Sequence, residues 1–268
     1  MIYFIITLIV ESIKTLIMSK IAVVTGGNRG LGRDMVLNLA KGGKDIIFTF
    51  NSKEDEANEV IKEVEALGRK AAAIQLNVER QSSFDLFFDQ LSSVLNDKFD
   101  GHKIDYWVNN AGIGLPTLLG HTDEKSFDTL MNIHLKSPYF LVQSAINFMN
   151  DGGGIVNIGT GLTRFSMIGY SVYAGLKSAM ETMTRYWAME LGNRKIRVNA
   201  VAPGAIETDF GGGAVRDNAE INKNIAGGTA LGRVGLPDDI GPVVAFLCSD
   251  ESKWVNGQRI EVSGGIHL

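Results

Sequence analysis

The stretch that decides the fold reads Thr25-Gly26-Gly27-Asn28-Arg29-Gly30-Leu31-Gly32. It follows a short apolar run at 21–24, and a pattern with helical spacing begins near Leu31. A strand that stops at spaced glycines and restarts as a helix presents backbone N–H groups at the positive end of the helix dipole, where a phosphate can bind. The spacing Gly-x-x-x-Gly-x-Gly differs from the common dinucleotide fingerprint, so a simple tight loop is the competing interpretation.

Strands and helices are predicted to alternate along the rest of the chain. Besides the first strand at 21–24, strands are predicted at 45–50, 71–76, 105–109, 154–158, 196–201 and 259–262. Helices are predicted at 31–41, 52–67 with a capping box at its start, 82–95, 123–148 with a break near Pro138, 171–191 and 237–248. This alternation is typical of a mostly parallel sheet covered by helices on both faces. No linker or repeat divides it, so we expect one α/β domain.

Composition narrows the functional classes. The 268 residues are 45% hydrophobic, which is typical of a globular protein, and the net charge of −4 without a basic cluster argues against nucleic acid as a partner. The single cysteine, Cys248, lies in an apolar run, where it predicts a buried thiol and suits the cytoplasm. The histidines have no metal-ligand spacing, so we predict no metal site. They are His102, His121, His134 and His267.

The first seventeen residues differ from the rest. Met1–Val10 is almost wholly apolar, but Glu11 and Lys14 interrupt the run before it reaches the roughly 20 residues of a membrane span. It also lacks the basic start and cleavage site of a signal peptide. Met18-Ser19-Lys20 resembles a natural beginning, so residues 1–17 are interpreted as an extension from an upstream start. A peripheral membrane helix is the alternative.

The end of the second predicted strand bears on the choice of nicotinamide cofactor. In dinucleotide sites an acidic residue there binds the ribose 2′-hydroxyl and repels a 2′-phosphate. This chain instead has Asn51, Ser52 and Lys53, and the first acidic residues belong to the next helix. Arg29 in the glycine loop can pair with a 2′-phosphate, although it can equally be a solvated loop residue. We therefore expect NADP(H), with NAD(H) as the alternative.

Tyr173 and Lys177 are four residues apart on a predicted helix and so project from one face. A phenol has a pKa near 10 in water, and a neighbouring ammonium is expected to lower it, so that the phenol can exchange a proton with a substrate oxygen. The pair suits carbonyl reduction. By spacing alone it can also be an unrelated tyrosine and lysine on one helix.

Taken together, the motifs resemble those of the short-chain dehydrogenase/reductase family, over roughly residues 18 to 268. They are the glycine turn, Asn109-Asn110-Ala111-Gly112, Tyr173-x-x-x-Lys177, Asn199 with Pro203-Gly204, and the ending Trp254-Val-Asn-Gly-Gln258…Gly264-Gly265. The resemblance, to 3-oxoacyl-carrier-protein reductases and related carbonyl reductases among others, implies a Rossmann-type doubly wound parallel sheet of about seven strands. It further implies an NAD(P)(H)-dependent oxidoreductase and a homotetramer or homodimer.

The same resemblance assigns roles to residues. Tyr173 would be the general acid in reduction and the base in oxidation, and Lys177 would lower its pKa and hold the nicotinamide ribose. Asn110 would help to close the cofactor groove, and Asn77 would lie near the adenine. The cofactor-binding residues expected in this way are Gly26, Asn28, Arg29, Gly30, Leu31, Gly32, Asn51, Ser52, Asn77, Val78, Asn110, Ala111, Gly112, Tyr173, Lys177, Pro203, Gly204, Ile206 and Thr208.

Two departures from the family pattern complete the expected catalytic set of Tyr173, Lys177, Thr160 and His134. Thr160 stands where the family usually has a serine that orients the substrate oxygen; it keeps the hydroxyl but adds a methyl group. His134 stands where the family usually has an asparagine whose backbone holds a proton-relay water. We interpret His134 as a structural histidine, with proton shuttling as the alternative.

The function expected from these residues is NADPH-dependent reduction of a ketone, with Tyr173 protonating the carbonyl oxygen. A 3-oxoacyl-carrier-protein reductase and a sugar or xenobiotic carbonyl reductase are the main subtypes. The glycine-rich segment 210–232 resembles the family's substrate lid. A sensor or scaffold that binds NADP(H) without turnover is the alternative function. The partner expected is a small-molecule or acyl carbonyl substrate.

Overall fold

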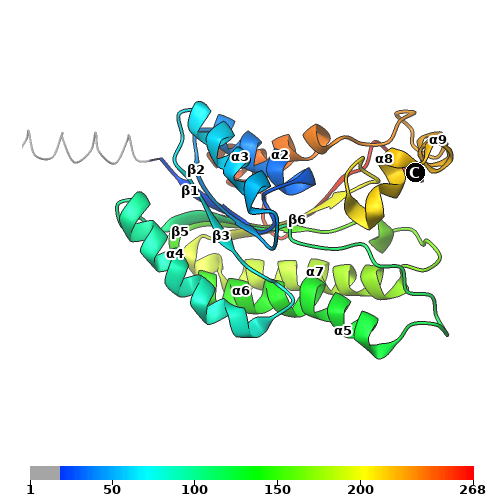
Figure 1. Ribbon diagram of the computed structural model, residues 1–268, viewed down its shortest axis with the longest axis horizontal. Coiled ribbons are helices and arrows are strands. Elements are labelled where there is room, and N and C mark those ends of the chain that lie inside the picture. The colour runs from blue at the N-terminus through cyan, green and yellow to red at the C-terminus, as the bar shows by residue number, and fades with distance from the viewer. Residues whose placement is uncertain (1–18) are drawn as a thin grey trace, which may run out of the picture.

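A seven-stranded parallel sheet forms the centre of the molecule (Figure 1). The computed structural model describes residues 19–268, and within them the strand order is β3-β2-β1-β4-β5-β6-β7. The strands are β1 (Ile21–Val24), β2 (Asp45–Phe50), β3 (Ala71–Gln75), β4 (Ile104–Asn109), β5 (Met149–Ile158), β6 (Arg197–Pro203) and β7 (Arg259–Val262). The order reverses between β1 and β4, and in such sheets ligands bind in the crevice beyond the strand ends at that point.

Helices cover both faces of the sheet, as Figure 1 shows. On one face α2 (Gly30–Lys41), α3 (Glu54–Ala66) and α10 (Gly241–Leu247) enclose one apolar core, and α2 packs on α10. On the other face α4 (Phe84–Lys98), α6 (Ser137–Ala145) and α7 (Ser171–Glu190) enclose the second core. The expected Rossmann-type fold is confirmed. The proposed extension at 1–17 lies outside the described residues.

One local prediction was wrong and one was right in part. The capping box at the start of α3 does not form: the preceding residue, Lys53, has a left-handed backbone (φ 64°) and no side chain among residues 19–268 caps the helix.

The interruption predicted near Pro138 takes the form of a π-helical turn. The segment 123–148 consists of α5 (Glu124–Met131), the π turn η2 (Asn132–Lys136) and α6, and Pro138 is the second residue of α6.

The segment after β6 contains more helix than its glycines indicate. Its elements are a short turn η5 (Phe210–Gly213), α8 (Ala214–Asp217) and α9 (Ala219–Gly227). Asn218 caps α9 by accepting hydrogen bonds from two backbone N–H groups of its first turn. These elements lie beyond the carboxyl end of the sheet, next to the C-terminus (Figure 1). Among residues 19–268, no helix is both long and apolar enough to span a membrane.

Candidate active site

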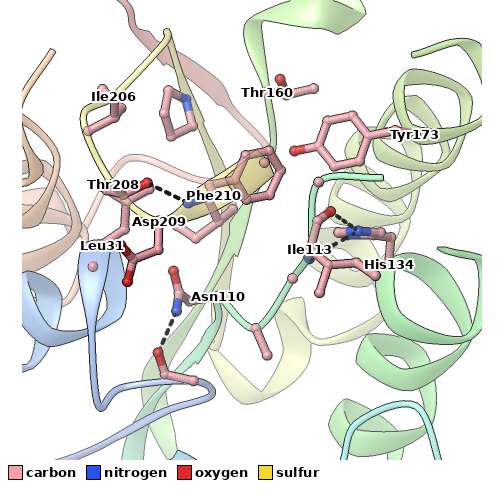
Figure 2. Close-up of a pocket in the computed structure, with 18 of the residues that line it drawn as sticks. Leu31, Asn110, Ile113, His134, Thr160, Tyr173, Ile206, Thr208, Asp209 and Phe210 are labelled. Carbon is pink, nitrogen blue, oxygen red and sulfur yellow. Dashed lines mark hydrogen bonds between the residues drawn. The ribbon is translucent and has the colours of Figure 1, made fainter. Parts of the chain in front are cut away.

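One cavity of about 820 Å³ lies beyond the carboxyl ends of β1, β4, β5 and β6 (Figure 2). Residues from eight segments of the sequence meet there. Its lining includes every residue that was assigned to the site from the sequence, namely Gly26, Asn28, Arg29, Gly30, Leu31, Gly32, Asn51, Ser52, Asn77, Val78, Asn110, Ala111, Gly112, His134, Thr160, Tyr173, Lys177, Pro203, Gly204, Ile206 and Thr208. Their roles depend on how each side chain is held.

The glycine turn is shaped by close backbone packing. Gly26 and Gly30 have positive φ angles of 67° and 53°, a region that favours glycine. A Cβ at Gly32 would lie 1.9 Å from the carbonyl oxygen of Gly26, so no side chain fits at this position. Helix α2 begins with no side-chain cap and no acidic residue in its first turn. This uncapped N-terminus fits a phosphate group of a dinucleotide.

Thr25 and Asn110 fasten the glycine turn to the end of β4. The Thr25 hydroxyl oxygen accepts hydrogen bonds from the backbone N–H groups of Asn110 and Ala111, each at 3.0 Å. The Asn110 side-chain amide donates to the carbonyl oxygens of Thr25 (2.9 Å) and Gly26 (3.0 Å). Asn110 therefore fixes the loop's shape, and Thr25 has a positioning role that its place in the motif did not reveal.

The two cations expected near a 2′-phosphate are already engaged with carboxylates. Arg29 is half-exposed, and its Nη1 lies 3.2 Å from Oδ2 of Asp209 in the segment after β6. Lys53 pairs with Glu56 at 2.7 Å, and Glu56 also accepts a hydrogen bond from the Asn28 side chain at 3.2 Å. Glu56 was not foreseen, because it lies inside α3 and reaches back to the glycine turn. Arg29 lines the cavity, and Lys53 directly follows two residues that line it.

Tyr173 projects from α7 with its hydroxyl directed into the cavity, near Phe210 and Thr160 (Figure 2). Its ring packs 5.9 Å from the ring of Phe210, centroid to centroid, and only 6% of the residue is exposed. Burial raises the pKa of the Tyr173 phenol well above its usual value, and the Thr160 side chain opposes this shift. The phenol is therefore protonated at neutral pH, as a proton donor must be.

Lys177 does not act on Tyr173 in the way expected. Its ammonium donates a 2.6 Å hydrogen bond to the carbonyl oxygen of Ile158 at the end of β5, and it lies 5.9 Å from the centre of the Tyr173 ring. Burial lowers the pKa of Lys177 to about 8. The net pKa shift of the phenol is therefore upward and not downward as expected, because desolvation of the phenol dominates.

His134 lies in the π-helical turn η2 and is almost fully buried. Its Nε2 is 2.8 Å from the carbonyl oxygen of Ile113, and its ring meets the Tyr173 ring edge-on at 4.9 Å. Burial lowers the pKa of His134 to about 3, so the imidazole is neutral at pH 7. Nδ1 has no hydrogen-bond partner among residues 19–268. Within residues 19–268, no group of three or more potential metal ligands occurs, at His134 or elsewhere.

The remaining wall of the cavity is apolar, and only its part within 210–232, the segment that resembles a substrate lid, was expected from the sequence. It is built by side chains that follow β5, by the helices after β6 and by the C-terminus. The residues are Leu162, Phe165, Met167, Tyr170, Phe210, Ile221, Ile225, Ile266 and His267. No sequence pattern links these segments, because only the strand order brings them together.

Comparisons with known proteins agree with this geometry. A family model described as enoyl-(acyl carrier protein) reductase matches residues 26–267. The hydroxynaphthalene reductase-like protein Arp2 of Metarhizium brunneum (strain ARSEF 3297) is 36% identical over 257 residues, which are 92% of this chain and 94% of that protein.

Two solved structures are similar along nearly the whole chain. The angucycline C-6 ketoreductase LanV with bound NADP has a TM-score of 0.89 at 32% identity, covering 94% of this chain and 97% of LanV. A blue fluorescent protein from a metagenomic library, in complex with NADPH, has a TM-score of 0.85 at 36% identity, covering 93% of this chain and 98% of that one. The expected cofactor, NADP(H), is the one that both of these structures contain.

The matched family model, the relatives and the structures all cover the segment that carries the glycine turn, the Tyr173–Lys177 pair and the cavity between them. Each of these proteins is named as a reductase or contains a nicotinamide dinucleotide phosphate. The chain belongs to the short-chain dehydrogenase/reductase family and is an NAD(P)-dependent oxidoreductase.

Proposed function

We propose that this protein uses NADPH to reduce a ring ketone of a flat, aromatic, bicyclic or polycyclic compound. One observation carries the proposal: the buried Tyr173, the uncapped start of α2 and a group of apolar side chains all line the same cavity. The relatives support it, because they include a hydroxynaphthalene reductase-like protein and an angucycline ketoreductase.

The residues present can hold the cofactor. The glycine turn and the first turn of α2 would bind the phosphates, and Arg29 with Asn51 and Ser52 would bind the 2′-phosphate. When bound, the nicotinamide supplies a hydride. No acidic residue stands at the end of β2 to repel the 2′-phosphate.

Proton transfer would be performed by the chain's own side chains. Tyr173, protonated at neutral pH, donates its proton to the carbonyl oxygen as negative charge develops there. The Thr160 hydroxyl donates a hydrogen bond to the same oxygen. Lys177, whose pKa of about 8 leaves it mostly charged at pH 7, stabilises the phenolate that results. Phe210 covers the Tyr173 ring and excludes water.

The apolar wall favours an aromatic substrate over an acyl chain or a sugar. Phe165, Tyr170 and Phe210 present aromatic rings to the cavity, and Met167 and Ile225 add apolar surface. Flat aromatic compounds pack well on such rings, whereas the hydroxyls of a sugar would lose their hydrogen bonds to water. Among the subtypes expected from the sequence, the cavity thus supports a carbonyl reductase of aromatic compounds.

The test is NADPH consumption with a tetralone, an acetoacetyl thioester and a keto sugar, followed by repetition with Tyr173→Phe. We expect the tetralone to have the highest kcat/KM and the variant to lose about a thousandfold in kcat. NADPH affinity of the variant should be unchanged. Turnover that survives in Tyr173→Phe would refute the mechanism, and a preference for the thioester would refute the substrate class.

We further propose that the protein is a cytoplasmic homodimer or homotetramer. Exposed apolar side chains on α7, Tyr186 and Met189, support association, and the single buried Cys248 suits a reducing compartment. Light scattering at micromolar concentration decides the oligomer number, and a monomeric mass would contradict the proposal.

A further inference from the structure

Arg164 fastens the end of the chain to strand β7. Its Nε and Nη2 form a two-pronged ion pair with Glu261, at 2.8 and 2.7 Å. Its Nη1 donates to the carbonyl oxygen of His267 at 2.7 Å, and Nη2 donates to that of Ile266 at 2.5 Å. One guanidinium therefore makes four hydrogen bonds, two to β7 and two to the backbone of the C-terminal segment.

A second arginine, Arg259, connects the Glu261 carboxylate to the backbone of Thr160. Arg259 donates to Glu261 at 3.0 Å and to Glu181 of α7 at 2.7 Å. Its Nη2 also donates to the carbonyl oxygen of Thr160 at 3.1 Å. Thr163 donates from its hydroxyl to the same Glu181 oxygen at 2.8 Å. The backbone that carries the Thr160 hydroxyl is thus tied to α7 and to β7.

The fastened segment forms part of the cavity. Ile266 and His267 line it, and the His267 ring packs edge-on against Phe165 at 4.7 Å. Phe165 also lines the cavity and directly follows Arg164. A hydrogen bond from the backbone N–H of His267 to the carbonyl of Gly228 connects this wall to the end of α9. Arg164 therefore holds two residues that line the cavity.

We propose that Arg164 and Arg259, joined through Glu261, are positioning residues that hold Ile266 and His267 as a fixed wall of the substrate pocket. The expected change in KM rests on the proposed ketone reduction. The expected loss of order in the C-terminal segment rests on the contacts alone.

This cluster differs from an ordinary surface ion pair. Glu261 and Glu181 have side chains that are only 20% and 13% exposed, and each accepts several charged or hydroxyl donors. Hydrogen bonding by Arg164 is the main cause that lowers the pKa of Glu261 to about 2, so the carboxylate stays charged at any working pH. A two-pronged ion pair between an arginine and a carboxylate fixes the relative orientation of the two groups as well as their distance. A single exposed ion pair does not fix the orientation.

The experiment compares Arg164→Gln with a matched control, Arg194→Gln. Arg194 has the same pattern of partners: it donates to a carboxylate, Asp151 (2.8 Å), and to two backbone carbonyls, of Ile146 (2.6 Å) and Met149 (2.7 Å). Arg194 lies at the amino ends of β5 and β6 and does not line the cavity. Loss of its contacts should therefore affect local structure there and leave Ile266 and His267 in place.

Hydrogen exchange and steady-state kinetics supply the two readouts. In Arg164→Gln we expect the hydrogen-bonded backbone amides of 264–268, those of Ile266 and His267, to exchange at least about tenfold faster. The KM for a tetralone should rise about tenfold, because the wall no longer holds the ring, while the KM for a small acyclic ketone changes much less. Glu261→Gln, which keeps the side-chain volume, should reproduce both effects, and Arg194→Gln should show neither.

The proposal is overturned if exchange at 264–268 or the tetralone KM stays at its unmodified value in both Arg164→Gln and Glu261→Gln, or if the small ketone is affected equally. Exchange is measured without substrate. An unmodified protein that reduces neither ketone would therefore refute the proposed function, and exchange alone would then decide whether the arginine holds the wall.

Discussion

At the scale of single residues, burial controls the ionisable groups of the cavity. It raises the pKa of Tyr173, and it lowers those of Lys177 and His134. The spacing of Tyr173 and Lys177 predicts a lowered phenol pKa, which is the opposite of the shift in the structure. That prediction treats both groups as if water surrounded them. The residues could be chosen from the sequence, but their proton affinities depend on packing that only the fold supplies.

His134 should make the protein sensitive to mild acid. Its folded pKa of about 3 lies below the unfolded value of 6.5, so the unfolded state binds more protons below pH 6.5 and stability falls as pH falls. Since the folded pKa lies well below 5, His134 should remove about 2 kcal/mol of unfolding free energy between pH 7 and pH 5. Denaturant unfolding of the protein and of His134→Asn at both pH values measures this.

In His134→Asn the decrease in unfolding free energy between pH 7 and pH 5 should be smaller by about 2 kcal/mol. The other three histidines are present in both proteins, so their contributions cancel. Equal losses in the two proteins would show that His134 is charged or solvated in the folded state.

Thr160 should tolerate loss of its methyl group but not of its hydroxyl. Thr160→Ser keeps the donor beside Tyr173, so kcat/KM for the tetralone should stay within about threefold. Thr160→Ala removes a hydrogen bond to the developing oxyanion, and kcat should fall about a hundredfold. NADPH affinity, measured by fluorescence titration, serves as the control and should not change in either variant. A fully active Thr160→Ala would exclude this role.

At the scale of elements, the glycine turn and the helix of Tyr173 and Lys177 were predictable because their signals are local. The π-helical turn η2 was predictable only as an irregularity near Pro138, since a π turn inserts one residue into a helix without a sequence mark of its own. The wall formed by Phe165 and His267 was hidden. Those residues are about a hundred positions apart and meet only because β5, β6 and β7 are neighbours.

Two glycines in helices should respond oppositely to the same substitution. A Cβ at Gly32 would collide with the carbonyl oxygen of Gly26, so Gly32→Ala should abolish NADPH binding or unfold the first βα unit. Gly175 lies within α7, and a Cβ there would meet no atom of another segment within 4 Å, so Gly175→Ala should raise the unfolding free energy by about 1 kcal/mol. Thermal unfolding and NADPH titration distinguish the two variants. A Gly175→Ala variant that is less stable than the unmodified protein would contradict the packing described for α7.

At the scale of the whole molecule, the cofactor edge and the segment after β6 are connected by charge. Arg29 of the glycine turn reaches Asp209, and Asp209 also pairs with Arg216 at 2.6 Å. These residues come from opposite ends of the chain and meet because β1 and β6 both end at the cavity. A 2′-phosphate that binds Arg29 must therefore compete with the Asp209 carboxylate for the same guanidinium.

Cofactor affinities in two variants test this competition. Arg29→Ala should weaken NADPH about tenfold and leave NADH unchanged, because only NADPH carries the phosphate. Asp209→Asn should tighten NADPH, since the competing charge is gone, and again leave NADH unchanged. Both effects should shrink as salt is raised, because the groups are half-exposed. Asp217→Asn is the matched control: Asp217 pairs with Arg216 at 2.7 Å but makes no contact with Arg29 among the ion pairs of residues 19–268. If Asp217→Asn tightened NADPH as much as Asp209→Asn does, the gain would come from general charge and not from release of Arg29.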